Sequence, residues 1–597
     1  MMSDRSDLCS STALRSFAIT FVFIVGLAPT AIFSQSVIPV SLDFSSDGTL
    51  LFVANRDCGS VSVLSSKTKE RIGEFDVPGQ PIDLLISGKQ ILVLDRQHSK
   101  LRVYSETGEQ LAEHDLSFPL ARFTSSADGE QVFVASTFGR ALQSFARIGE
   151  KWVPCSSCKL PFPPLEMKWI DGQLLVASAF EAELALLDCS QIEQRIAVMK
   201  TAQLRGHNIR GIELVGEEIY LTLQELNPLA HSSRDDVHWG NLLANKLVHF
   251  PTAALFERTI GGEASPLSSD EAPRDLNAYR RDFELGEPGN GSGDPGRLLY
   301  DASARRLFVL LTGSSELLEF DPVQQEVIRR VNTGTVPRAI AKSNSDVAIA
   351  NQFSNDVTWI AQGEGETSSQ ETHVTTLSDS KPTAVQRGEQ LFFDSRLSHD
   401  GWMSCHSCHS DGHSSGQLND NQSDGGFGAA KRIPSLLGVA DTEPWGWTGQ
   451  VTSLEQQVKN SIKLTMHGNV LDAKQVEALV AFMKSLQVPG RTDVHLKAGK
   501  EKKLADGKEL FRNLGCSTCH QPDRNFTSPK TYDVGWEDRQ GNQHFNPPSL
   551  LGVRMRAKLF HDGRSDLDSM IKRAEHKLPR KLTPSERTSL LAYLRSL

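Results

Sequence analysis

A strand unit that recurs about every 40 residues constrains the fold of this chain more than any other feature of its sequence. The first copy has an alternating apolar strand at residues 40–44, a turn at Asp47-Gly48, and further strands at 51–55 and 60–64. Second strands of the same kind are centred near Phe52, Leu92, Phe133, Leu175, Ile219, Phe308 and Ala348. A period near 40 built from strands alone predicts the blades of a β-propeller.

The step between the fifth and sixth of these strands is 89 residues, about twice the others. It indicates either one blade with an insertion at about residues 226–295 or an eighth, degenerate blade, and we favour seven blades over residues 36–361. Ser-Ser-Asp-Gly at 45–48, followed by Leu-Phe-Val-Ala-Asn at 51–55, resembles the YVTN-type repeats of bacterial propellers. Because propellers host unrelated functions, this resemblance implies a fold and no activity.

The first 35 residues have the pattern of an export signal. Two arginines precede an apolar run at residues 17–33, and cleavage near Ser34 or Gln35 would remove residues 1–35. The run is shorter than the ~20 residues that a membrane-spanning helix needs, so we expect no stable membrane span in the mature chain. The predicted location is periplasmic or otherwise exported.

The sequence pattern changes after residues 362–380, a polar stretch rich in Ser, Thr and Glu that we expect to be a linker. From there the apolar period becomes 3.6, and one helical unit occurs twice, which predicts two all-α domains at residues 381–490 and 498–597. The sequence Pro-Ser-Leu-Leu-Gly-Val, for example, stands at 434–439 and again at 548–553.

Each of these domains contains one Cys-x-x-Cys-His sequence, the pattern of covalent haem attachment. Two thiols one helical turn apart can each add to a haem vinyl group, and the next residue then places an imidazole under the iron. We therefore predict two covalently bound haem c groups in an all-β, seven-bladed propeller followed by two all-α cytochrome c-type domains. The residues that would hold the haems are Cys405, Cys408 and His409 in the first domain and Cys516, Cys519 and His520 in the second.

A zinc or redox Cys-x-x-Cys site is the alternative at these two positions. Both copies carry the histidine, and export is compatible with haem attachment, so we favour haem. By contrast, Cys155-x-x-Cys158 is followed by Lys159, and we expect a local disulfide or ordinary thiols there.

The charge of the chain is unevenly distributed. The formal net charge is −10, so no overall basic field exists to bind nucleic acid, which we do not expect as a partner. Residues 381–597 carry a net charge of +6 and the preceding residues −16. The acidic part could seat the basic part or attract a basic partner.

Further motifs surround the two Cys-x-x-Cys-His sequences: Leu391-Phe392, Pro434-Ser435-Leu436, Trp447-x-Gly449, Pro548-Ser549-Leu550, Phe560-His561-Asp562-Gly563-Arg564 and Leu582-Thr583-Pro584. In this order they resemble the bacterial di-haem cytochrome c peroxidase and MauG family. The resemblance implies an oxidoreductase that reduces hydrogen peroxide, or performs a MauG-like oxidation, with a small soluble protein as electron donor. It also implies that His409 marks the reactive haem, His520 the relay haem, and Trp447 an electron-transfer residue between them, although a core aromatic is the simpler role for Trp447.

Several positions of the first helical domain depart from the family pattern. Phe427 stands where peroxidases place a distal histidine. His467 falls where the family carries an active-site carboxylate, and it could act as acid and base toward peroxide, bind the iron, or lie on the surface. His413 is a second distal candidate.

The second helical domain departs from the pattern near Ala574, where the usual methionine or tyrosine ligand is missing. Met570 and His576 are the substitutes that could bind the iron, although a methionine on an amphipathic helix is usually a core residue. Ile433 and Arg556 replace an asparagine and a threonine that resemble calcium-binding positions, so a bridging calcium ion is doubtful.

Three functions stay open at this point. The first is a di-haem oxidoreductase with His467 and Trp447 as catalytic residues, and the second is a non-catalytic di-haem electron carrier whose propeller binds a redox partner or substrate. The third is oxidation within the propeller, as in quinone-dependent dehydrogenases, for which the insertion offers a polar cluster at His231, Arg234, Asp235, Asp236, His238 and Trp239. That cluster contains no cofactor motif, so we favour simple loop decoration, and we expect the glycine-rich residues 286–296 to form an exposed loop.

Overall fold

The computed structural model describes residues 36–597, apart from 117, 194, 257–271, 362–371, 423–425, 491–499, 574–575 and 577. The export signal predicted for residues 1–35 and the first part of the predicted linker lie outside the described residues. No helix in the described part of the chain is both long and apolar enough to cross a membrane.

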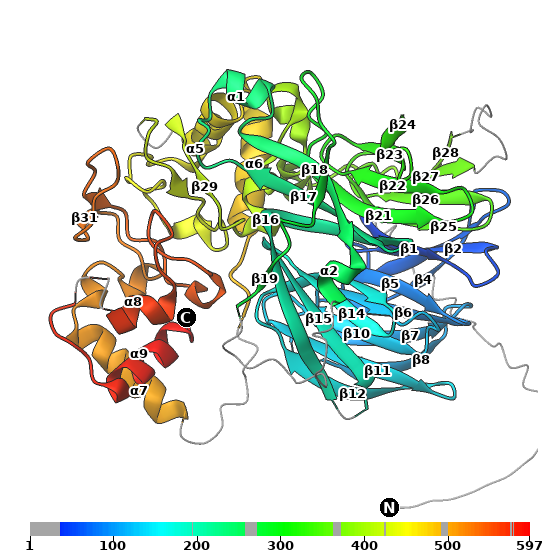
Figure 1. Cartoon of the computed structure of the whole chain (residues 1–597), viewed down its shortest axis with the longest axis horizontal. Coiled ribbons are helices and arrows are strands. Elements are labelled where there is room, and N and C mark those ends of the chain that lie inside the picture. The colour runs from blue at the N-terminus through cyan, green and yellow to red at the C-terminus, as the bar shows by residue number, and fades with distance from the viewer. Residues whose placement is uncertain are drawn as a thin grey trace, which may run out of the picture. The chain divides into compact units, whose positions relative to one another are not determined.

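Antiparallel sheets of four strands, each paired in chain order, make up most of the N-terminal part (Figure 1). Tight turns produce this order, because each turn returns the chain beside the strand it has just left. The sheets are β1 (Pro39–Phe44), β2 (Leu50–Asn55), β3 (Ser60–Ser65) and β4 (Arg71–Asp76); β5 (Pro81–Ser87), β6 (Gln90–Asp95), β7 (Lys100–Ser105) and β8 (Gln110–Asp115); β9 (Arg122–Ser125), β10 (Gln131–Ser136), β11 (Ala141–Ile148) and β12 (Lys151–Lys159); β21 (Pro295–Asp301), β22 (Arg306–Leu311), β23 (Glu316–Asp321) and β24 (Glu326–Asn332); and β25 (Pro337–Lys342), β26 (Asp346–Asn351), β27 (Asp356–Ala361) and β28 (Thr372–Thr376).

A larger sheet of eight strands is built around one long strand, β16. The first part of β16 pairs with β15 and its second part with β17, so this strand belongs to two four-stranded groups. The sheet contains β13 (Pro164–Ile170), β14 (Gln173–Ser178), β15 (Glu181–Gln191), β16 (Arg195–Val215), β17 (Glu218–Leu226), β18 (Leu243–Pro251), β19 (Arg274–Asp275) and β20 (Arg281–Glu284), and the short helices α1 (Arg234–His238) and α2 (Thr252–Phe256) lie in its connections.

The predicted boundaries of the insertion and the linker need adjustment. Within the segment expected as an insertion at about residues 226–295, β18 and β20 pair with each other and continue the sheet. Within the segment expected as a linker at 362–380, β28 pairs with β27. The sheet region therefore extends to Thr376.

The sheets close into a ring. The innermost strands β1, β5, β9, β13, β16, β21 and β25 contact one another in this order, and β25 contacts β1. The residues aligned at the centres of the second strands, from Phe52 to Ala348, are all at most 1% exposed. Because these side chains fill the space between neighbouring sheets, the N-terminal part is an all-β, propeller-like domain.

The C-terminal part consists of two similar helical units. Each also contains a pair of two-residue strands beside its helices. The first unit contains α3 (Ala384–Phe392), α4 (Cys405–Cys408), β29 (Leu418–Asn419), β30 (Lys431–Arg432), α5 (Leu454–Asn460) and α6 (Ala473–Ser485); the second contains α7 (Lys500–Asn513), β31 (Tyr532–Asp533), β32 (His544–Phe545), α8 (Leu567–Arg573) and α9 (Pro584–Leu594).

The same helix crossing occurs in both units, α3 on α6 and α7 on α9. A glycine stands at the closest approach in each. A Cβ atom on Gly388 would lie 1.9 Å from the carbonyl oxygen of Ala478, and one on Gly507 would lie 2.1 Å from that of Ser589. Only glycine permits these helices to pack so closely, which explains why the two glycines stand at equivalent places in the sequence repeat.

The first helical unit packs on one face of the ring through buried polar contacts. Asn245 Nδ2 in β18 donates to the carbonyl oxygen of Trp402 at 2.8 Å, and Arg56 forms an ion pair of 2.7 Å with Glu389 of α3. Residues 291–296 are buried in this contact, so the prediction of an exposed loop is wrong for them. A Cβ atom on Gly291 would lie only 2.4 Å from the Cα atom of Trp402, so the glycine allows this close approach.

Candidate functional site

The first Cys-x-x-Cys-His sequence forms a short helix, α4, with its own cap. Ser404 Oγ accepts a hydrogen bond from the His406 amide at 3.0 Å, and Ser407 Oγ accepts one from the Ser404 amide at 2.9 Å. One turn of helix therefore places Cys405 and Cys408 on the same side, and both line one cavity. Burial raises the pKa of both thiols to about 12, so this surrounding favours uncharged sulfur, such as a thioether.

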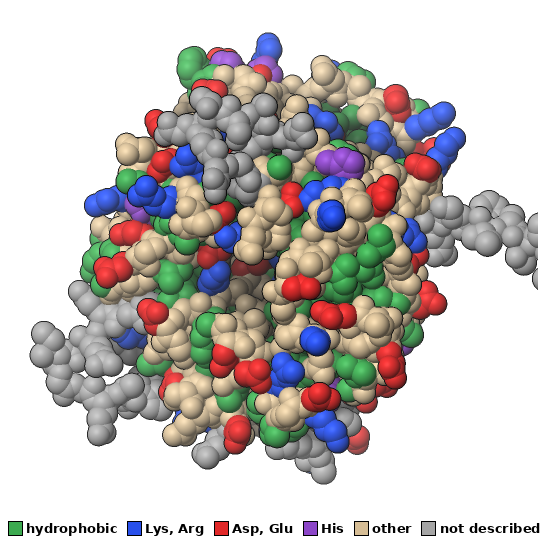
Figure 2. Space-filling model, turned by 90° about the vertical axis from the view of Figure 1, so that its right-hand side faces the viewer, with side chains coloured by type: hydrophobic (Ala, Val, Ile, Leu, Met, Phe, Trp, Pro, Cys, Tyr) green, Lys and Arg blue, Asp and Glu red, His purple; other side chains and the backbone are tan. Residues whose placement is uncertain are grey.

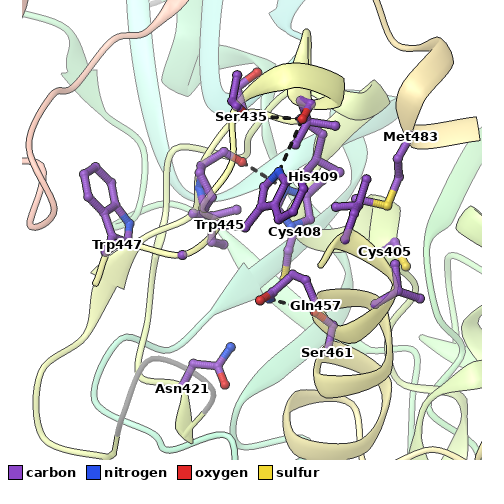
Figure 3. A pocket seen from close by; sticks show the side chains of 18 of the residues that line it. Cys405, Cys408, His409, Asn421, Ser435, Trp445, Trp447, Gln457, Ser461 and Met483 are labelled. Carbon is purple, nitrogen blue, oxygen red and sulfur yellow. Dashed lines mark hydrogen bonds between the residues drawn. The ribbon is translucent and has the colours of Figure 1, made fainter. Parts of the chain in front are cut away.

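The cavity beside α4 has a volume of about 240 Å³ and a mainly apolar wall (Figure 3). An apolar wall with a few polar groups suits a large planar cofactor. The apolar side chains come from α3, α5 and α6 and from the segments between them: Phe392, Met403, Ile433, Leu436, Val439, Leu454, Val458, Ile462, Met466, Leu479 and Met483.

His409 follows α4 and also lines this cavity. Its Nδ1 lies 3.0 Å from the carbonyl oxygen of Pro434, which can only accept a hydrogen bond, so Nδ1 carries the proton and Nε2 the lone pair. Burial lowers the pKa of His409 to about 4, which keeps the imidazole neutral. Two cysteines and one neutral imidazole at this cavity fit the donor set of haem c.

The second Cys-x-x-Cys-His sequence has an equivalent histidine. His520 Nδ1 lies 3.1 Å from the carbonyl oxygen of Phe526, so its Nε2 also holds the lone pair. Burial, with a smaller effect from His576, lowers the pKa of His520 to about 4. Cys516 and Cys519, which precede this histidine in the chain, are half-buried and have free thiols. The donor set of a second haem c is therefore present.

One of the two predicted sixth ligands in the second unit, His576, lies close to His520. The ring centroids of these two histidines are 6.4 Å apart. Met570 is half-buried and packs against the apolar core of the second unit. His520 and His576 are therefore close neighbours, and Met570 contacts apolar side chains.

Trp447 lies where the first cavity meets the second helical unit. It lines the cavity, is 7% exposed, and donates its Nε1 hydrogen to the carbonyl oxygen of Arg432 at 2.7 Å. Its own carbonyl oxygen accepts from the Asn546 amide at 2.8 Å, and its ring meets that of His561 edge-on at 6.4 Å. These contacts place an aromatic ring between the cavity and the second unit.

The two candidate distal histidines do not belong to the described wall of the cavity. His467 Nε2 lies 2.9 Å from the carbonyl oxygen of Ser232 in the propeller-like domain. His413 Nδ1 lies 2.8 Å from Ser435 Oγ, and its ring packs on Phe180. Each is occupied in a contact between domains.

Several polar side chains that sequence reasoning missed line the same cavity, among them Asn421, Gln457 and Thr465. Thr465 Oγ1 donates to Asn421 Oδ1 at 2.9 Å. In Figure 3, Asn421 and Gln457 lie on the lower side of the cavity, away from His409, and the Asn421 amide points toward its interior. Leu454 and Ser461 also line the cavity, and Gln457 stands at helical spacing from both. This spacing is the feature of the sequence that could have identified Gln457 as a cavity residue.

The polar cluster of the predicted insertion contacts the first helical unit. His238 Nδ1 lies 2.6 Å from Asp400 Oδ2, and His231 Nε2 lies 3.4 Å from Asp420 Oδ2. The ring of His231 also stacks on Phe427 at 4.8 Å. Through these contacts the two histidines hold the propeller-like domain against the first helical unit.

Known proteins resemble the C-terminal part of the chain. The family model described as di-haem cytochrome c peroxidase matches residues 382–490 and 505–590. The methylamine utilization protein MauG of Methylorubrum extorquens is 28% identical over 279 residues, which cover 36% of this chain and 78% of that protein. MauG of Methylophilus methylotrophus is 24% identical over 237 residues, covering 31% and 70%.

Among solved structures, a chain of Kuenenia stuttgartiensis hydrazine synthase matches with a TM-score of 0.45 and 18% identity, covering 57% of this chain and 99% of that chain. BamB from Moraxella catarrhalis matches with a TM-score of 0.34 and 13% identity, covering 54% and 85%. The sequence comparisons confirm the predicted resemblance of the C-terminal part to the di-haem peroxidase and MauG family.

Proposed function

We propose that this chain is an exported di-haem c-type oxidoreductase that reduces hydrogen peroxide, or uses it for a MauG-like oxidation. We further propose that a seven-bladed propeller precedes two cytochrome c-type domains. The observation that carries the proposal is the repeated donor set: Cys405, Cys408 and His409 at one cavity, and Cys516, Cys519 and His520 in the sibling unit. The similarity to di-haem peroxidases and MauG supports it.

In this proposal Cys405 and Cys408 would hold the first haem through thioethers, and His409 Nε2 would bind its iron. When bound, haem supplies an iron that can accept electrons and bind an oxygen ligand. Gln457 and Asn421 offer amide N–H donors at the cavity, and Thr465 donates to Asn421 and so orients its amide. These groups would hold peroxide by hydrogen bonds, and we assign no proton transfer to His467 because it contacts Ser232 instead.

Cys516, Cys519 and His520, with His576 close by, would hold the second haem, which would supply an iron that accepts electrons, and Trp447 would lie between this unit and the first cavity. We propose a small soluble protein as the electron donor. The backbone and ring contacts of Trp447 to Asn546 and His561 support this place.

Electron paramagnetic resonance and peroxide turnover test the proposal together. The ferric protein is expected to show one high-spin and one low-spin haem, and to consume peroxide with a reduced small cytochrome as donor. Gln457→Leu is expected to lower kcat/KM for peroxide by about 10²-fold, because it removes a donor from the site of developing charge. The matched control is Gln456→Leu, an exposed residue of the same helix. Equal activities of the two variants, or two low-spin haems that ignore peroxide, would contradict the proposal.

The second candidate is a di-haem electron carrier without catalysis, and Phe427 at the expected distal-histidine position favours it. A carrier would be reduced and reoxidised by protein partners at normal rates, yet give no peroxide turnover above that of free haem. The turnover measurement on the wild-type protein therefore separates the two candidates.

A further inference from the structure

Two histidines and one aspartate from different domains bring their metal-binding atoms together beside helix α1. His238 is the last residue of α1 in the propeller-like domain, and His399 and Asp400 stand between α3 and α4 in the first helical unit. In the part of the chain that the structure describes, they form the one group of three His, Cys, Asp or Glu side chains whose ligand atoms all lie within 4.8 Å of one another. His238 stands 162 residues before Asp400 in the sequence, so the fold alone brings them together.

Both imidazoles face the same carboxylate oxygen. His238 Nδ1 lies 2.6 Å from Asp400 Oδ2, and His399 Nε2 lies 3.6 Å from it. The two rings also stack, with centroids 5.6 Å apart and an angle of 29° between their planes. A hydrogen bond from His238 accounts for the shorter distance only. The second imidazole is held close to the carboxylate at a distance too long for a hydrogen bond.

Hydrogen bonds to the backbone fix the positions of these residues. Trp402 Nε1, in a side chain that is 3% exposed, donates to the carbonyl oxygen of His238 at 3.2 Å. The Gly291 amide donates to the carbonyl oxygen of Asp400 at 2.7 Å, and His399 directly precedes Asp400 in the chain. Because the backbone of the cluster is already fixed, an ion that binds there has to order little more than three side chains.

The cluster is accessible from solvent. The side chains of His238, His399 and Asp400 are 36%, 21% and 18% exposed. In Figure 2, histidine side chains beside acidic ones are visible at the top of the molecule, the end at which Figure 1 shows α1. An ion can therefore reach the cluster, and water can complete its coordination.

The donor atoms and their spacing suit a transition-metal ion. Zn²⁺ binds histidine nitrogen and carboxylate oxygen at about 2.0–2.2 Å, most often with four ligands at tetrahedral positions. Ligand atoms at such positions lie about 3.3 Å apart, a value between the two distances from the imidazole nitrogens to Asp400 Oδ2. Imidazole nitrogen favours zinc, copper and nickel, whereas calcium and magnesium prefer oxygen ligands.

We propose that His238, His399 and Asp400 form a binding site for a divalent transition-metal ion such as Zn²⁺, which links the propeller-like domain to the first helical unit. His238 Nδ1, His399 Nε2 and Asp400 Oδ2 supply three ligands, and water supplies the fourth. A neutral imidazole carries its proton on either nitrogen, so His238 exchanges its hydrogen bond to Asp400 for a bond to the ion when the proton moves to Nε2. None of the three residues belongs to the described wall of the cavity beside α4, and the inference does not depend on peroxide chemistry.

Calorimetric titration of the chelator-treated ferric holoprotein, without a histidine tag, with zinc chloride tests the proposal. One site per chain is expected. His399→Gln is expected to raise Kd at least about a hundredfold, because it removes one ligand. The same variant leaves the hydrogen bond between His238 and Asp400 in place, so it separates metal binding from that contact. The matched control is His98→Gln in the propeller-like domain, which removes an imidazole 2.7 Å from Asp95 Oδ2 and should leave Kd unchanged.

Thermal unfolding and crystallography provide the second arm. Zinc should raise the Tm of the wild type and of His98→Gln, because it binds the folded state, and should leave the Tm of His399→Gln unchanged. In crystals grown with zinc chloride, the anomalous signal that appears only above the zinc absorption edge locates zinc separately from haem iron. Zinc held by His238, His399 and Asp400 is the expected result. Absence of zinc from this place, or an unchanged Kd in a folded, haem-loaded His399→Gln protein, would overturn the proposal.

Discussion

Ser407 donates its hydroxyl hydrogen to Asp294 at 2.6 Å, and this hydrogen bond joins helix α4 to the propeller-like domain. Asp294 also accepts from Ser404, which caps the same helix, and is only 4% exposed. His406 and the two serines keep the pKa of Asp294 below its usual value despite burial, so the group is a carboxylate. A propeller residue therefore positions the two cysteines that would hold the first haem.

Asp294→Ala is expected to destabilise the protein by about 3 kcal/mol, because it leaves the buried hydroxyls of Ser404 and Ser407 without their acceptor. Urea unfolding followed by circular dichroism measures the change. Asp115→Ala, at a carboxylate that is 87% exposed, is the control and should change the free energy of unfolding by less than about 0.5 kcal/mol. A normal stability for Asp294→Ala would show that the two domains do not depend on this contact.

Gly388→Ala is expected to be more damaging than its size suggests. The added methyl group would lie 1.9 Å from the carbonyl oxygen of Ala478, so α3 and α6 must move apart, at a cost of about 3 kcal/mol. Gly507→Ala should force α7 and α9 apart in the same way. The control, Gly490→Ala, adds a methyl group with no neighbour within 4 Å. Thermal unfolding should rank the first two variants clearly below the control.

Sequence reasoning predicted the repeated features well, because they depend on local pattern. The residues aligned at the centres of the second strands are buried as expected, and the cysteines and histidine of the first Cys-x-x-Cys-His sequence line one cavity. Period and motif spacing act over a few residues, so they can be read without knowing the fold.

Contacts between distant segments could not be predicted in the same way. His467 was expected to act on peroxide, but it contacts Ser232, 235 residues earlier in the chain, and lies outside the described cavity wall. Asp294 stands in a glycine-rich segment that reads as an exposed loop, yet it is buried because Trp402 packs over that segment. Such effects arise from domain packing, for which a single sequence contains no periodic signal.

Asp43→Asn is expected to stabilise the protein at neutral pH. Burial, opposed by the Ile86 amide and assisted by Asp83, raises the pKa of Asp43 to about 6 from 3.8. The folded state therefore holds this proton more tightly than the unfolded state, so stability falls as pH rises from about 4 to about 6 and then levels off. Because asparagine does not ionise, the substitution should add about 1–3 kcal/mol to the free energy of unfolding at pH 7.5 and little at pH 4.

Urea unfolding of wild type and Asp43→Asn at several pH values measures this difference. The control is Asp76→Asn, at an exposed residue. The difference in free energy of unfolding between this variant and wild type should be the same at all pH values. A difference between wild type and Asp43→Asn that is the same at pH 4 and pH 7.5 would contradict a raised pKa of Asp43 in the folded protein.

His576→Ala is expected to convert the second haem from low spin to high spin, because it removes the imidazole whose ring lies 6.4 Å from that of His520. Met570→Ala should leave the low-spin signal unchanged, since Met570 packs in the apolar core. Electron paramagnetic resonance of the two ferric variants distinguishes the residues. The reverse result would identify Met570 as the ligand.

Trp447→Phe is expected to slow electron transfer between the haems while leaving both of them in place. The phenyl ring keeps most of the packing, but the hydrogen bond to the Arg432 carbonyl is lost and the aromatic contact with His561 shrinks. We expect peroxide turnover to fall about tenfold, which corresponds to about 1.4 kcal/mol in the barrier of the limiting step. Stopped-flow spectroscopy of the half-reduced protein would measure the transfer directly. Trp445→Phe is the control, because Trp445 lines the same cavity but donates its Nε1 hydrogen to Val439 within the first unit. If both variants slow transfer equally, the effect comes from the cavity wall and Trp447 has no special place on the electron route.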